Sequence, residues 1–131
     1  MTKQVGALLA MVLGVFGCAS EITRYPAELS RGRQPQDKIF VASQTVPVHP
    51  DSGYERSIKL GTEFVDAGGI SQGTILKPRN AVFTLEGAHM HEAYLVVNDG
   101  RLVGFYLPVE KSFSPLTVSV TLPLEEREVP K

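Results

Sequence analysis

The sequence predicts an all-β fold, either a small antiparallel β-sandwich or a partly closed barrel. From Lys38 onward the chain consists of short runs rich in Val, Ile, Thr, Phe and Tyr, separated by Gly, Pro, Asn and Asp. This composition is typical of antiparallel strands joined by tight turns. Strands do not alternate with helical runs, which argues against a doubly wound α/β fold. A length of 131 residues suits a single domain with its own hydrophobic core.

The first element is an apolar run at residues 5–16, preceded by Lys3. A run of about a dozen residues is shorter than the ~20 that a permanent transmembrane helix needs. A positive start followed by such a run predicts a signal helix that engages the export machinery and is then removed. The alternative is a short buried helix of a cytoplasmic domain.

The apolar run ends in Val15-Phe16-Gly17-Cys18, and Cys18 is the sole cysteine of the chain. This segment resembles the lipobox of bacterial lipoprotein precursors, with an aliphatic residue three positions before the cysteine and a small residue directly before it. The resemblance implies a signal peptide at 1–17, a diacylglycerol on the Cys18 sulfur, and a fatty acid such as palmitate on the new amino terminus. Two or three acyl chains make membrane attachment effectively permanent.

The residue after Cys18 is Ala19 rather than aspartate. By the lipoprotein sorting rule of bacteria with two membranes, the resemblance implies transfer to the outer membrane, facing the periplasm. With Cys18 modified, no thiol is left for a disulfide, a metal or catalysis. Charge is balanced, with 13 Lys and Arg against 14 Asp and Glu and a net charge of −1. That balance argues against nucleic-acid binding.

Residues 18–37 contain two prolines, a glycine and many polar groups without a sustained apolar period. We interpret them as the lipidated cysteine followed by a flexible tether, whose reach as a coil is on the order of 25 Å. The β domain is then expected at 38–124. The remaining residues, 125–131, are expected to form a solvated C-terminal tail.

The firmest predicted element is a hairpin around Asp99-Gly100, a pair suited to a type I′ turn. Counting from that turn pairs Val97 with Leu102, and on the same face Leu95 with Gly104 and Ala93 with Tyr106. The other face then pairs Val96 with Val103 and Tyr94 with Phe105. Both faces are apolar, so we expect this hairpin to lie centrally and to be covered on both sides.

The run at 116–122 alternates Leu and Val with hydroxyl residues between Pro115 and Pro123. Strict alternation predicts a strand with one buried and one solvated face. Further strands are expected at 39–46, 56–60, 73–76 and 81–86.

Residues Gly69-Ile70-Ser71-Gln72-Gly73 match the G-x-S-x-G spelling of a hydrolase nucleophile elbow. That motif needs a strand before the serine and a helix after it. Here a strand is predicted on the C-terminal side, so we favour a glycine-rich loop between strands over a catalytic Ser71.

His89 and His91 are two residues apart, which on a strand points both imidazoles to one face. They are candidate ligands of a metal ion, with Glu86 or His49 as a possible third ligand. The competing interpretation places both rings at the margin of the core with polar partners.

Tyr94, Phe105 and Tyr106, with Phe83 nearby, are candidate contacts for an acyl chain, a glycan or a peptide, or else ordinary core. Phe113, between two serines, is a candidate partner contact on an exposed loop.

These observations predict a lipid-anchored, non-enzymatic protein of the bacterial envelope that needs no cofactor beyond its covalent lipid. It would act through contacts with envelope proteins, in a structural, assembly or accessory role. The alternative is a periplasmic module that binds a small ligand or metal through His89 and His91 or the aromatic strand face. A remote alternative is an envelope hydrolase using Ser71.

Overall fold

The computed structural model describes residues 22–30, 38–51 and 54–128, and these ranges contain strands and no helix. The predicted all-β fold is confirmed. The strands are β1 (Tyr25–Pro26), β2 (Lys38–Ala42), β3 (Val46–Val48), β4 (Arg56–Ile58), β5 (Glu63–Ile70), β6 (Gly73–Pro78), β7 (Thr84–Glu86), β8 (Met90–Glu92), β9 (Tyr94–Asn98), β10 (Arg101–Leu107), β11 (Ser112–Thr121) and β12 (Leu124–Glu128).

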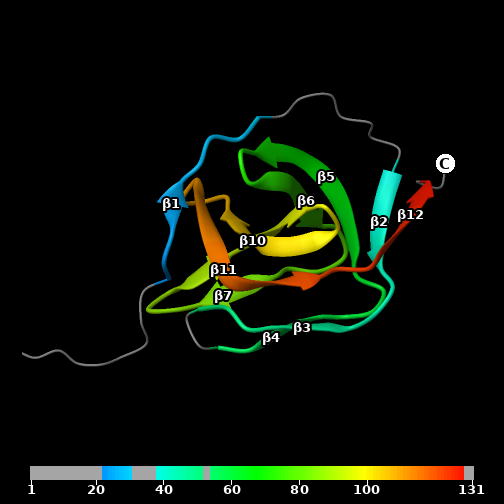
Figure 1. Ribbon diagram of the computed structural model, residues 1–131, viewed down its shortest axis with the longest axis horizontal. Helices are drawn as coiled ribbons and strands as arrows, with labels where there is room; N and C mark the ends of the chain where they lie inside the picture. Colours follow the sequence, from blue (N-terminus) through cyan, green and yellow to red (C-terminus); the bar gives the residue numbers. More distant parts are fainter. Residues whose placement is uncertain (1–21, 31–37, 52–53, 129–131) are drawn as a thin grey trace, which may run out of the picture.

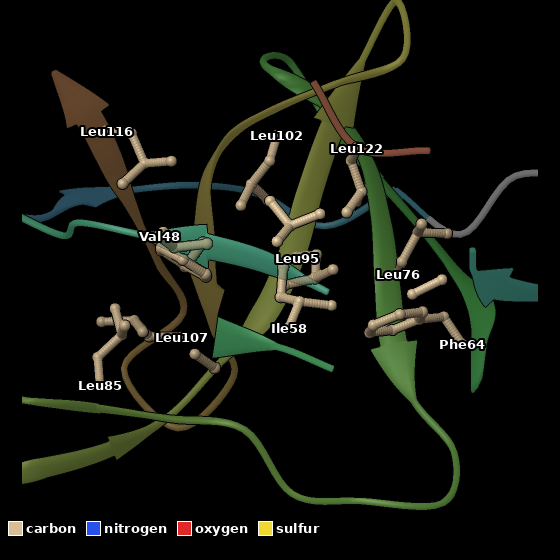
Figure 2. Close-up of a cluster of buried hydrophobic side chains, with 14 of the residues drawn as sticks. Val48, Ile58, Phe64, Leu76, Leu85, Leu95, Leu102, Leu107, Leu116 and Leu122 are labelled. Atoms are coloured by element: carbon tan, nitrogen blue, oxygen red, sulfur yellow. The ribbon is translucent and has the colours of Figure 1, made fainter. Parts of the chain in front are cut away.

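Eight strands form one antiparallel sheet in the order β1-β11-β10-β9-β6-β5-β2-β12, and the ribbons β3–β4 and β7–β8 form two small sheets. The ribbons lie across one face of the large sheet (Figure 1). Side chains from both layers fill the space between them (Figure 2). This main cluster includes Val48 and Ile58 from the ribbons and Phe64, Leu95 and Phe105 from the sheet. The arrangement is sandwich-like.

The other face of the sheet carries a second, smaller cluster, made by Ile70, Ile75, Val96, Tyr106 and Phe113. The central hairpin β9–β10 therefore has both faces buried, as its sequence predicts. Val96 from this hairpin is 0% exposed on the second face, and Leu95 is 0% exposed on the first.

Residues 22–30, expected to belong to a flexible tether, are instead part of the fold. Tyr25 and Pro26 pair with β11, and Ser30 makes a bridge to Gly69 of β5. Because β11 and β5 are not neighbours in the sheet, this segment crosses the second face of the sheet between these two strands and partly covers it (Figure 1). Ala27 and Leu29 pack on the second cluster, while Ile22 is buried in the main one. These apolar side chains outweigh the loop-like composition around them.

The β9–β10 turn forms as predicted, with φ of 53° at Asp99 and 73° at Gly100. Val97 pairs with Leu102, also as predicted. Beyond that pair the predicted register is wrong, because a β-bulge at Val103 shifts the rest by one residue. Gly104 pairs with Val96, Phe105 with Leu95 and Tyr106 with Tyr94.

Gly104, directly after the bulge, lets β11 approach β10 closely. A Cβ at this position would lie 2.5 Å from the Ser114 carbonyl oxygen and 2.7 Å from Cε1 of Phe113. β11 therefore packs against bare backbone, and a side chain here would push it away.

β11 begins at Ser112 rather than after Pro115, and it too is irregular. Gly104 pairs with Pro115 and Leu102 with Val120, so residues 116–119 bulge out of the ladder with β10. The predicted alternation fails at the centre of this bulge, where Val118 is 72% exposed. Leu116 and Leu122 are buried as predicted.

β5 was not predicted, because its Asp66, Gly68 and Gly69 resemble turn residues. They form another bulge, in which Gly68 has a φ of 114° and its N–H donates to Oδ1 of Asp66 at 2.8 Å. The run expected at 39–46 is two strands, β2 and β3, and those expected at 56–60 and 81–86 are shorter. The charged run at 125–128, expected as a tail, pairs with β2 as β12.

Candidate functional site

Ser71 lies in the tight turn between β5 and β6, where Ile70 pairs with Gly73. The residue is exposed, and its hydroxyl donates to Oε1 of Gln72 at 3.1 Å. A strand follows the turn, whereas a nucleophile elbow requires a helix there. The local geometry is that of a glycine-containing β-turn, which is the interpretation the sequence favours.

His91 and His89 occupy different environments. His91 is the central residue of β8 and is 6% exposed, whereas His89 precedes the strand and is exposed. Nδ1 of His91 lies 2.7 Å from Oε2 of Glu110, a residue in the turn between β10 and β11. This contact ties the β7–β8 ribbon to the large sheet. Glu110 was not singled out by the sequence analysis, because nothing in its spacing links it to His91.

The other candidate metal ligands have charged neighbours of their own. His49 Nδ1 is 3.4 Å from a Glu55 oxygen, and Glu86 is 3.7 Å from Nη1 of Arg56. Within the described ranges, no three His, Cys, Asp or Glu side chains are grouped to hold a metal ion. The two-histidine pattern thus lacks a third ligand there.

The candidate aromatic residues are divided between the two faces of the sheet by the bulge at Val103. On the main face, Phe83 and Phe105 stack with ring centroids 5.5 Å apart, and the guanidinium of Arg56 lies 5.4 Å from the Phe83 centroid. On the other face, Tyr94 and Tyr106 are tilted, with centroids 6.5 Å apart. They do not form one continuous aromatic surface.

Tyr94 lies at the margin of the second cluster, and the ammonium of Lys77 is 5.8 Å from its ring centroid. Burial raises the pKa of the Tyr94 hydroxyl above its usual 10.0, and the negative charge of Glu92 raises it further. Tyr94 is therefore a neutral hydroxyl across the physiological range and is not poised for acid–base chemistry there.

Phe113, expected on an exposed loop, is only 6% exposed. It belongs to β11, pairs with Tyr106 and Tyr25, and packs in the second cluster. As a core residue it is not available as a partner contact.

Two pockets open beside these residues. One, of about 520 Å³, is lined by residues 26–29 together with Tyr106 and Lys111. The other, of about 200 Å³, lies between β4 and the loop before β7 and includes Arg56, Lys59 and Phe83. Nη2 of Arg56 donates to Oγ1 of Thr84 at 3.2 Å, so with Glu86 beside it the guanidinium serves to join β4 to β7.

The site predicted with the most specific motif, Cys18, lies outside the described residues, as does the whole lipobox. Across residues 22–30, 38–51 and 54–128 no helix is long and apolar enough to cross a membrane. The first described residue, Ile22, is four positions after Cys18. Comparison with protein-family models, with curated proteins and with solved structures finds no match to the chain.

Proposed function

We propose that the protein is a lipid-anchored, non-enzymatic component of the bacterial cell envelope that acts through contacts with other envelope proteins. The observation that carries this proposal is the lipobox-like run Val15-Phe16-Gly17-Cys18 at the end of a short apolar segment. The signal peptide would be cut before Cys18, whose sulfur and new amino group would carry the acyl chains. Ala19 favours the periplasmic face of the outer membrane.

The geometry of the domain supports a binding or structural role over a catalytic one. Three of the singled-out polar residues have partners within the domain: His91 with Glu110, His49 with Glu55, and Ser71 with Gln72. Of these contacts, the buried one between His91 and Glu110 joins the β7–β8 ribbon to the turn between β10 and β11.

The anchor is tested with Cys18→Ser, expressed in the native organism with labelled fatty acid. The wild-type chain should incorporate label and run at the size of the mature protein, and Cys18→Ser should do neither. The matched control is Ser20→Ala, which leaves the lipobox intact and should behave like the wild type. Unchanged size and labelling in Cys18→Ser would refute the anchor.

The role in protein contacts is tested by crosslinking in intact cells and identifying the crosslinked proteins. The wild type should give reproducible envelope partners, and these should disappear in Cys18→Ser if anchoring brings the partners together. The reproducible absence of any envelope partner would contradict the proposal.

Metal or ligand capture is the competing function, and thermal unfolding distinguishes it. Divalent cations should leave the wild type and the His89→Ala/His91→Ala double variant with equal shifts in melting temperature. A stabilisation seen in the wild type and lost in the double variant would favour metal binding instead. The pocket beside Tyr106 is tested in the same way. A small ligand that raises the melting temperature of the wild type but not that of Lys111→Ala would favour ligand binding there.

A further inference from the structure

The buried position of Ile22 limits how far the domain can stand from the membrane. Ile22 is 5% exposed and packs in the main cluster. It lies four residues after Cys18, and four extended residues span at most about 14 Å. A tether extending to residue 37 would have allowed a reach on the order of 25 Å in any direction. Docking of residues 22–30 removes that freedom.

The pairing of β1 with β11 shows which part of the surface lies next to this attachment point. Tyr25 pairs with Phe113 and Pro26 with Ser112. Continuing this antiparallel register by three residues beyond β1 would bring Ile22 level with Leu116. Both side chains belong to the main cluster. Figure 1 shows the two segments side by side.

The bulge of β11, at residues 116–119, begins at Leu116. It carries the exposed Val118, and the Thr117 N–H donates to Oδ1 of Asp51 at 3.2 Å, which fixes the bulge to the loop before β4. Val118 is 72% exposed in this bulge, so most of its apolar side chain is left in water by the fold. A lipid surface beside it would remove its apolar area from water.

We propose that the bulge at 116–119 faces the bilayer and that Val118 lies at the lipid surface, so that the domain is held in one orientation. This inference rests on the proposed lipid on Cys18. The short connection brings the domain to the membrane, and the position of Ile22 selects the face. We expect the turn between β10 and β11 to lie farther from the bilayer, since Ser112 and Val118 are up to about 20 Å apart along β11.

The structure offers a matched pair of positions for a test. Val118 and Val109 are the same residue type with nearly equal exposure, 72% and 75%, and Val109 is in the turn between β10 and β11. The sulfur of Cys18 is blocked by lipid in the mature protein, and the chain has no other cysteine. Val118→Cys and Val109→Cys each provide a unique thiol for a fluorescent label.

The labelled, lipid-modified proteins are reconstituted into phosphatidylcholine vesicles that carry a nitroxide quencher in the headgroup region. We expect several-fold stronger quenching at position 118 than at 109. Equal quenching, or stronger quenching at 109, would overturn the proposal. Shielding of position 118 in native membranes but not in lipid vesicles would also overturn it, because the covering partner would then be a protein.

A loosened variant tests the length argument. A Gly/Ser linker of about 20 residues, inserted between Ser20 and Glu21, restores a reach on the order of 25 Å. Quenching at 118 should then fall to the level seen at 109, and unchanged quenching would contradict the role of the short connection. The mass of every preparation is measured first, so that absence of lipid, which refutes the anchor, is distinguished from loss of orientation in a lipidated protein.

Discussion

Ile22→Ala tests whether residues 22–30 are held to the domain by the packing of this one side chain. Removing most of a buried isoleucine costs about 2 to 5 kcal/mol when the surroundings stay in place. Here the segment can respond by leaving the sheet. Besides the pairing of Tyr25 and Pro26 with β11, its backbone bonds include Ala27 N–H to Lys111 O at 3.1 Å and a reciprocal pair between Ser30 and Gly69 at 2.7 Å each. Each such bond contributes about 0.5 to 1.5 kcal/mol.

We therefore expect the variant to open locally rather than to unfold as a whole. A loss of about 2 kcal/mol in the stability of the docked segment corresponds to roughly thirtyfold faster amide exchange at Ala27, Ser30 and Gly69. Amides at the centre of β9, such as that of Leu95, should change much less. Hydrogen exchange followed by NMR measures these sites individually.

Leu60→Ala is the control, because Leu60 is 64% exposed and its loss should leave every exchange rate nearly unchanged. Unaltered exchange at Ala27 and Ser30 in Ile22→Ala would refute the docking argument. An equal increase throughout β9 would refute it too, since that result means that the segment and the sheet unfold together.

Three further predictions concern the sheet. Gly104→Ala should cost about 3 kcal/mol in urea unfolding, the upper end for overpacking, because its Cβ would meet the backbone of β11. A Cβ at Gly100 meets no atom, so Gly100→Ala should lower stability by only about 1 kcal/mol, because of the positive φ at this position. Equal losses of stability in the two variants would contradict the close approach of β11 to Gly104. Because the pKa of Tyr94 is raised in the folded state, its hydroxyl ionises at lower pH in the unfolded chain than in the folded one. The stability that the neutral hydroxyl contributes is therefore complete below pH 10 and is lost as pH rises through the folded-state pKa. Tyr94→Phe should make alkaline unfolding less steep, as followed by circular dichroism, and an unchanged slope would contradict this. Finally, Glu125→Val removes a charge from the edge strand β12 and should promote self-association in size-exclusion chromatography; a variant that elutes like the wild type would show that this charge does not protect the edge.

Local chemistry explains what the sequence predicted well. Asp99-Gly100 favours positive φ at both positions, and the turn forms as expected. The continuous apolar runs of β9 and β10 predicted a central hairpin, and both of its faces are buried.

The fold predictions that failed did so because of β-bulges and of packing between segments far apart in the sequence. No count along the hairpin reveals the bulge at Val103 or the close approach of β11 to Gly104 beside it. The bulge moves Tyr94 away from Phe105 and so divides the aromatic group. Residues 22–30 looked like a tether because their apolar side chains follow no sustained period, but Ile22 has a place in the core.

The candidate site shows the same limit. The spacing of His89 and His91 predicted one shared face, but β8 begins only at Met90, so alternation does not extend to His89. The partner of His91 is Glu110, which the tertiary fold supplies. Spacing along the sequence predicts which side chains of one strand share a face, but not which residues of other segments contact them.

The most direct test of the proposed anchor is the intact mass of the protein extracted from its native membranes. We predict a chain that begins at Cys18, lacks residues 1–17, and is heavier than its remaining sequence by a diacylglyceryl group and an amide-linked fatty acid. A chain that retains residues 1–17, or one with an unmodified thiol at Cys18, would contradict the account.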